Sequence, residues 1–287
     1  MNHDLFPIYT QCFPGYPMRE ENFYDTLRPG SEFTHIIRAF DAKGNTVGFA
    51  LVCGRTITLI CVLPDYRGQG YGALLLKKAE RLIRADHINT PIILGYDTAH
   101  YIFQGVPIEY GAVGFFEKYG YTAPETTMNM GLELVDFDIE RLNLPEPEGI
   151  RFRLAEESDR PALIAAIEDT NPEWHDYFAD YEDAIMLAVS DTKIIGFQML
   201  DMDGVRLQNA HEKMGCIGCV GIINEAREKG IGRRMVAEGI CWLREQGCVA
   251  IELLYVAIPE WYEKLGFYSV SKQWMGRKDC MKVARCK

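Results

Sequence analysis

Apolar and polar residues follow the same order in each half of the chain. In the first half, alternation and β-branched residues predict strands over 34–39, 46–53 and 56–63, and a three-to-four-residue apolar repeat predicts a helix over 72–85. In the second half the corresponding patterns predict strands over 184–189, 194–200 and 216–223 and a helix over 233–246. Each half continues with a strand, over 91–95 or 249–255, and a short helix that ends at a glycine. The chain is therefore expected to carry one α/β fold twice.

The clearest interruption of these patterns is the segment 144–149, Leu-Pro-Glu-Pro-Glu-Gly. Two prolines and a glycine among charged residues neither continue a helix nor fit an inner strand. Residues 150–154 then alternate as a strand, and Ser158, Asp159 and Pro161 are typical of a helix start. The sequence predicts domains at 1–144 and 150–287, joined by a linker at 145–149.

A hexapeptide of the form R-x-x-G-x-G stands between the third strand and the helix in both halves. It begins at Arg67 and recurs at Arg227. Backbone amides at a helix start, together with the helix dipole, favour an anion, and glycine allows positive φ and a close approach of the ligand. Neither copy has the Lys-Ser or Lys-Thr of a Walker A loop, and neither fits the G-x-G-x-x-G dinucleotide fingerprint. The loops predict phosphate binding without favouring NTP or NAD.

Composition restricts the class of protein further. The 287 residues are 48% hydrophobic and 25% charged, as in a globular protein with two domains. No apolar run approaches the ~18 residues of a membrane span, and residues 1–11 lack the pattern of a secretory signal. Nine scattered cysteines, an odd number, favour reduced thiols and a cytoplasmic location. Strand alternation would place Cys216 and Cys219 on opposite faces, so we expect packing roles and no metal.

The net charge of −11 also bears on partners. Because an acidic protein repels phosphates at long range, nucleic acid is not an expected partner, whereas a cationic small molecule is attracted. The sequence does not determine the oligomeric state.

The two halves end in similar motifs, Phe-Glu-Lys-Tyr-Gly-Tyr at 116–121 and Tyr-Glu-Lys-Leu-Gly-Phe at 262–267. With the preceding strand, glycine loop, helix and strand, this order resembles the GNAT N-acetyltransferase superfamily, and it appears twice. The resemblance implies two consecutive mixed β-sheets, each splayed open and flanked by helices. It also implies that acetyl-CoA lies in the gap, with its pyrophosphate on the loop amides and its pantetheine arm paired with the strand before the loop.

Carried over to this sequence, the resemblance predicts cofactor contacts in both halves. In the first half these are Ile60, Cys61, Val62, Arg67, Gly68, Gln69, Gly70, Tyr71 and Gly72. In the second half they are Val220, Gly221, Ile222, Arg227, Glu228, Lys229, Gly230, Ile231 and Gly232.

The resemblance also assigns the general acid. Tyr262 matches the tyrosine that protonates the departing CoA thiolate in the family, whereas the first half has Phe116, which has no proton to give. The second copy departs from the family at Tyr255 and Ile258, where asparagine and alanine are common. An amine must also lose a proton before it attacks a thioester. Glu212 and Glu252 are the nearest carboxylates in sequence, and for both a solvated or salt-bridged surface role is favoured over catalysis.

The acceptor site would be roofed by the segment after the first strand of each half. Residues 168–183 combine acidic residues with Trp174, His175, Tyr177, Phe178 and Tyr181, which suits a cationic amine. The alternative is an amphipathic helix pair with a solvated acidic face. The equivalent segment 8–27 of the first half is aromatic with mixed charge, and residues 103–107 add a loop that either lines a pocket or only connects elements.

The leading hypothesis is a tandem acetyltransferase that moves an acetyl group from acetyl-CoA directly to a small-molecule amine in a ternary complex. One alternative is a protein that binds or senses acyl-CoA without catalysis. Another is a single active domain braced by a structural one.

Overall fold

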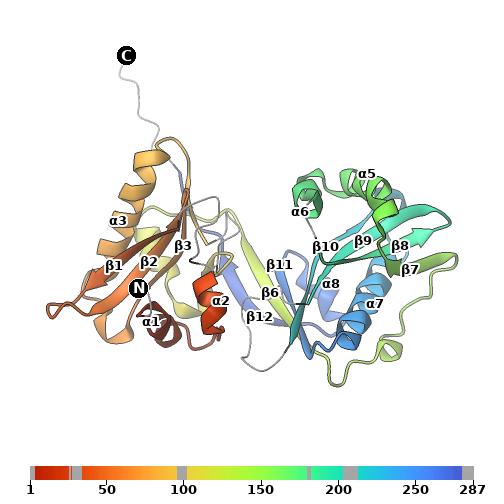
Figure 1. Cartoon of the computed structure of the whole chain (residues 1–287), viewed down its shortest axis with the longest axis horizontal. Helices are drawn as coiled ribbons and strands as arrows, with labels where there is room; N and C mark the ends of the chain where they lie inside the picture. The colour runs from red at the N-terminus through yellow and green to blue at the C-terminus, as the bar shows by residue number, and fades with distance from the viewer. Residues whose placement is uncertain are drawn as a thin grey trace, which may run out of the picture. The chain divides into compact units, whose positions relative to one another are not determined.

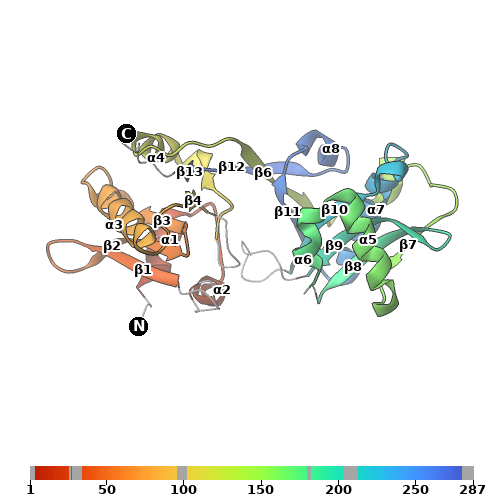
Figure 2. The same ribbon diagram turned by 90° about the horizontal axis from the view of Figure 1, so that it is seen from above.

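The computed structural model describes residues 4–25, 27, 34–95, 102–179, 182–202 and 213–279 (Figures 1 and 2). The chain divides into two compact units. The first unit consists of Met1–Met128, Arg206–Ala210 and Ser271–Lys287, and the second of Asn129–Val205 and His211–Val270. The predicted linker at 145–149 lies within the second unit. The linker stays a prediction of where the two sequence repeats join. The division into compact units does not test it, because compact units depend on strand pairing and not on the order of the chain.

The first unit is built on a five-stranded sheet in the order β1-β2-β3-β4-β13. Its strands are β1 (Thr34–Phe40), β2 (Thr46–Cys53), β3 (Thr56–Val62), β4 (Ile92–Leu94) and β13 (Arg277–Lys278). Strand β3 pairs in parallel with β4 at Thr56 and Ile57, and β4 ends at Leu94 while β3 continues to Val62. The described part of this sheet is thus splayed between β3 and β4.

Helices cover both faces of this sheet because alternate residues of β2 point to opposite sides. Phe49 and Leu51 pack in one apolar cluster with α1 (Leu5–Cys12) and α2 (Glu20–Asp25). Ala50 and Val52 pack on the other side with α3 (Tyr71–Asp86). The unit also contains η1 (Pro64–Tyr66), β5 (Val106–Pro107), η2 (Ile108–Tyr110), α4 (Val113–Lys118) and the start of β6 (Thr126–Glu133).

The described part of the second unit contains five whole strands, in the order β11-β10-β9-β8-β7, together with the larger part of β6 next to β11 and the first three residues of β12 next to β6. Strand β10 pairs in parallel with β11 from Met214↔Ala250 to Cys216↔Glu252, and beyond Cys216 it continues to Ile222 paired only with β9 among the described strands. The splay between β3 and β4 therefore recurs here. The strands are β7 (Ile150–Leu154), β8 (Ala184–Ser190), β9 (Lys193–Asp201), β10 (Met214–Ile222), β11 (Ala250–Val256) and β12 (Tyr268–Trp274).

Helices again cover both faces of the sheet. Gln198 of β9 donates a hydrogen bond from Nε2 to the Met235 carbonyl of α7 at 2.7 Å, whereas the neighbouring Phe197 contacts Phe178 of α6 on the opposite face. The helices are α5 (Arg160–Thr170), α6 (His175–Ala179), α7 (Ile231–Glu245) and α8 (Pro259–Glu263), with short 3-10 turns at Ile139–Leu142, Glu157–Asp159, Pro172–Trp174 and Asn224–Ala226.

The strands and helices predicted from the hydrophobic pattern are confirmed to within two residues at each end. The apolar repeat of α7 faces the core, since Val236, Ile240 and Leu243 are fully buried. The mixed α/β fold class is confirmed, with one splayed sheet per unit.

Candidate active site

The two glycine loops adopt the same backbone path. In the first, Gly68 and Gly70 have φ of 74° and 90°, and α3 begins at Tyr71. In the second, Glu228 and Gly230 have φ of 65° and 76°, and α7 begins at Ile231. Neither helix has a side-chain cap at its N-terminus. Both starts therefore present backbone amides and a positive dipole end, which suits a pyrophosphate.

The two arginines hold these loops to the preceding strand. Arg67 donates from Nε to the Val62 carbonyl at 3.0 Å, and Arg227 donates from Nε to the Ile222 carbonyl at 3.1 Å. Each bond closes the turn between strand end and helix start. The predicted arginine charge is thus positioned by a backbone contact.

A cavity of about 480 Å³ lies beside the first loop. Its lining includes seven of the predicted cofactor residues: Ile60, Cys61, Val62, Arg67, Gly68, Gly70 and Gly72. Gln69 instead donates to the Asp65 carbonyl at 2.9 Å, and the Tyr71 ring packs edge-on against Tyr66. Their side chains shape the turn. The assignment of the whole set to CoA binding remains a prediction.

Sequence reasoning missed two groups that line this cavity. Cys12, the last residue of α1, and Tyr110 of η2 both face it. Cys12 accepts a hydrogen bond from the Cys61 thiol, which with the Arg67 charge lowers the pKa of Cys12, while burial raises the pKa of Cys61. A thiol in α1 has no sequence signal that connects it to a strand 49 positions later, so only the fold identifies the pair.

The short helices α4 and α8 place equivalent aromatic pairs against the last glycine of each loop. A Cβ at Gly72 would lie 3.5 Å from the Phe115 ring, and one at Gly232 would lie 3.3 Å from the Trp261 ring. The next residue in each helix has nearly the same neighbours. Phe116 lies 5.8 Å from Tyr121 at 74°, and Tyr262 lies 5.9 Å from Phe267 at 82°, between ring centroids. Phe116 and Tyr262 thus occupy one structural position and differ by a hydroxyl.

Tyr262 is half-buried beside β10. Burial, with a smaller contribution from the nearby Cys219 thiol, raises the pKa of Tyr262 to about 12. The phenol therefore keeps its proton at neutral pH and can donate it. Upstream, Tyr255 adopts φ of 61°, a left-handed conformation that asparagine and glycine tolerate more easily than tyrosine. This is the position where the family commonly has asparagine.

Glu252 is the carboxylate that the structure brings to the splay of the second unit. Cross-strand pairs join Asp201 to Cys216 and Cys216 to Glu252, so these three residues share the sheet face that carries Phe197. Glu252 is 5% exposed, and within the described ranges its Oε1 has no hydrogen-bond partner. Burial raises the pKa of Glu252 to about 7. The surface role considered for it is wrong, because its side chain is buried.

The expected placement of Cys216 and Cys219 on opposite faces is wrong, because alternation does not hold between them. The register of β10 against β9 shifts between Gly218 and Gly221, and Cys219 has φ of 45°. Such a bulge inserts one extra residue and breaks the two-residue period. The two thiols are close enough for Cys219 to contribute to the raised pKa of Cys216. Within the described ranges no cluster of three metal-ligating side chains is found.

The roof aromatics mostly pack into the core. In the second unit, Phe178 and Trp174 lie edge-on to Phe197 at 5.3 Å and 6.3 Å, whereas Tyr177 is exposed. His175 is exposed, with Nδ1 3.3 Å from the Asp176 carboxylate. In the first unit, Tyr9 and Phe23 are fully buried. Tyr181 and Glu212, both named from sequence, lie outside the described residues.

Comparisons with known proteins agree with this geometry. Residues 32–123 match the acetyltransferase (GNAT) domain, and residues 151–267 match the acetyltransferase (GNAT) family. The chain therefore belongs to the GNAT acetyltransferase superfamily and contains two such domains. It is an N-acetyltransferase that takes the acetyl group from acetyl-CoA and has an amine as acceptor.

A relative from Saccharopolyspora erythraea named mycothiol acetyltransferase is 28% identical over 262 residues, which cover 83% of each chain. The glucosamine N-acetyltransferase region of a fungal multi-domain GH3 β-N-acetylglucosaminidase shares the fold at 22% identity and a TM-score of 0.78. That match covers 96% of this chain and 36% of the other, so this chain spans about a third of its length. A tandem GNAT protein from clavulanic acid biosynthesis also shares the fold, at 12% identity and a TM-score of 0.67, with 98% and 95% of the two chains covered.

The described helices include none that is both long and apolar enough to cross a membrane.

Proposed function

We propose that the second domain catalyses acetylation of a small amine by direct attack on acetyl-CoA, with Tyr262 as general acid and Glu252 as general base. The observation that carries this proposal is the buried Glu252 carboxylate with an unpartnered oxygen, on the strand next to β10, where β10 and β11 separate. Among the described residues, no equivalent carboxylate lines the cavities of the first unit beside Phe116.

The two side chains divide the proton transfers between them. Acetyl-CoA supplies an activated acyl carbon, with its pyrophosphate on the amides of 227–232 and its pantetheine along Val220, Gly221 and Ile222. Glu252, with a pKa near 7, takes one proton from the ammonium form of the acceptor, so that the nitrogen lone pair attacks the thioester. Tyr262, protonated at neutral pH, donates a proton to the sulfur as the C–S bond breaks, and the second proton that the nitrogen loses restores the tyrosine. Both pKa values suit these roles, since the base is matched to neutral pH and the acid holds its proton.

We propose a cationic primary amine as the acceptor class. The protein has a net charge of −11, and Glu252 and Asp201 share the sheet face at the splay. An ammonium group is attracted to this face and, once bound, is deprotonated there. A cytoplasmic location is proposed with it, because acetyl-CoA and free thiols both fit a reducing compartment.

The test is a thioester-turnover assay on the full chain with a panel of amines, including glucosamine, in which free CoA thiol and acetylated product are both measured. We expect turnover with at least one cationic amine, and intersecting double-reciprocal lines, because both substrates are bound together before attack. Parallel lines would indicate an acyl-enzyme and contradict direct attack. Binding of acetyl-CoA with no turnover across the panel would favour the sensing alternative.

A further inference from the structure

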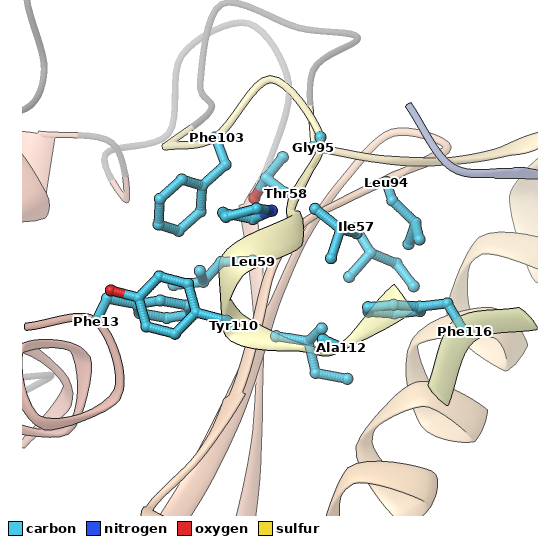
Figure 3. A pocket seen from close by; sticks show the side chains of 14 residues that line it. Phe13, Ile57, Thr58, Leu59, Leu94, Gly95, Phe103, Tyr110, Ala112 and Phe116 are labelled. Atoms are coloured by element: carbon cyan, nitrogen blue, oxygen red, sulfur yellow. The ribbon is translucent and has the colours of Figure 1, made fainter. Parts of the chain in front are cut away.

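A second, smaller cavity continues from the cofactor cavity of the first unit into the splay between β3 and β4. It has a volume of about 60 Å³ (Figure 3). Five residues line both cavities: Phe13, Ile60, Tyr110, Ala112 and Phe116. Phe116, at the position of the catalytic tyrosine, therefore stands between the two spaces. A CoA arm that follows β3 from the glycine loop would direct its acyl end past Phe116 into this pocket.

The walls of this acyl pocket are apolar. In Figure 3 the rings of Phe13, Phe103 and Tyr110 lie on one side, and Ile57 and Leu94 lie on the other. Phe13 is 5.0 Å from Phe103 and 5.3 Å from Tyr110 between ring centroids, which forms a continuous aromatic wall. Among the residues that the structure describes, no Asp, Glu, His, Lys or Arg lines this pocket. An ammonium group would lose its hydration there without a counter-charge, so the pocket does not suit a cationic amine.

The volume is larger than an acetyl group requires. One water-sized group occupies ~10–15 Å³ on this scale. The pocket of about 60 Å³ therefore has room for roughly four such groups, whereas acetyl offers one methyl beyond its carbonyl carbon. An acetyl group would leave most of the apolar wall uncovered.

We propose that the first domain binds a CoA thioester with an apolar acyl chain longer than acetyl, its chain seated between β3 and β4. This rests on the placement of CoA at residues 67–72 and does not depend on the chemistry proposed for the second domain. The ligand class is a short aliphatic acyl-CoA, such as propionyl-CoA or butyryl-CoA. Since Phe116 donates no proton and no carboxylate of the described part of the chain lines the site, this acyl-CoA is bound without transfer to an amine.

The test is a two-site calorimetric titration of the full chain with CoA, acetyl-CoA, propionyl-CoA, butyryl-CoA and hexanoyl-CoA. Each buried methylene is expected to raise affinity at one site by about fourfold. Butyryl-CoA should thus bind that site about 15-fold more tightly than acetyl-CoA. Hexanoyl-CoA should gain nothing further, because the pocket is then full.

Variants of Leu59 show whether the chain-length effect arises in the first domain, because Leu59 lines the acyl pocket and not the cofactor cavity. Leu59→Phe should remove the gain in affinity from acetyl-CoA to butyryl-CoA, while free CoA still binds. The volume-conserving Leu59→Met should keep the gain. Phe103→Leu should extend it toward hexanoyl-CoA.

Two results would overturn the proposal: equal affinity for acetyl-CoA and butyryl-CoA at both sites, or a chain-length gain that persists in Leu59→Phe. The chain-length series on the unaltered protein needs no variant to fold. Amine turnover, which tests the second domain, is measured separately, so either proposal can fail without the other.

Discussion

In the first domain a cavity of about 480 Å³ opens beside the glycine loop, and the position after Phe115 carries another phenylalanine. In the second domain the same position carries Tyr262, and Glu252 is buried on the neighbouring strand with a pKa near 7. The arginine contacts and aromatic geometry of the two loops agree closely. The halves thus share the parts that would hold CoA and differ in the parts that would move protons.

This difference separates ligand binding from chemistry within one fold. The loop binds anions through backbone amides, which need only the correct φ values and therefore persist when side chains change. Acid and base need particular side chains at particular burial, and a single substitution removes them. Four matched changes test whether the comparison holds, from the largest expected effect to the smallest.

The largest effect is expected at the shared aromatic position. Tyr262→Phe should lower turnover by roughly 10²–10⁴, since the leaving thiolate loses its proton donor, while affinity for CoA stays nearly unchanged. The reverse change, Phe116→Tyr, should produce no amine acetylation in a Tyr262→Phe background, because none of the described residues that line that site is a carboxylate. Steady-state turnover with acetyl-CoA checks both. An unaltered rate in Tyr262→Phe would refute its role.

Glu252→Gln should lower turnover by about 10² or more and remove the rise of kcat with pH near 7. The free energy of unfolding, in contrast, should be higher in Glu252→Gln than in the unaltered protein. The folded pKa lies above the ordinary value of 4.5, so ionisation destabilises the fold progressively as pH rises from 4.5 to 7, and fully above 7. Urea unfolding at pH 8 should show Glu252→Gln to be more stable, by at most about 3 kcal/mol, with little difference at pH 4. A less stable variant at pH 8 would contradict the buried carboxylate.

Alanine at the glycine just before each helix should destabilise the fold by different amounts in the two loops. Both Gly70→Ala and Gly230→Ala force a side chain into the left-handed region, which costs about 1–2 kcal/mol. A Cβ at Gly230 would also lie 2.6 Å from Pro145 Cγ, whereas a Cβ at Gly70 has nothing within 4 Å. Thermal unfolding should therefore show a further loss of roughly 1 kcal/mol for Gly230→Ala. Adding Pro145→Ala should abolish the excess, and an excess that persists would have another cause.

The smallest effect is expected two residues earlier. Glu228 adopts φ of 65°, where the first loop has Gly68. Glu228→Gly should stabilise the fold by a few tenths to about 1 kcal/mol, because relief of strain exceeds the added entropy of the unfolded chain. Gly68→Glu should destabilise by a similar amount. Denaturant titration of both variants checks the sign, and two changes of the same sign would contradict an equivalent turn.

The sequence was sufficient to predict the repeated elements, because their hydrophobic periods are local properties of the chain. The glycine loops were equally accessible, since the residues that allow positive φ are adjacent in sequence. The boundaries of the compact units could not be predicted from the sequence. Ser271–Lys287 belong to the first unit although they follow the second repeat. No local pattern encodes which sheet a late strand joins.

The sequence by itself determined two αβ repeats, two glycine turns that lead into helices, and a tyrosine at position 262 where the first repeat has Phe116. Tertiary structure alone decided that Glu252 lies opposite Cys216, that Cys12 meets Cys61, and that an apolar pocket opens behind Phe116. The physical reason is that these contacts depend on how strands pair and helices pack, which neighbours in the chain do not set. A backbone turn is set by neighbours in the chain, whereas burial, pKa and cavity volume depend on residues that only strand pairing and helix packing bring together.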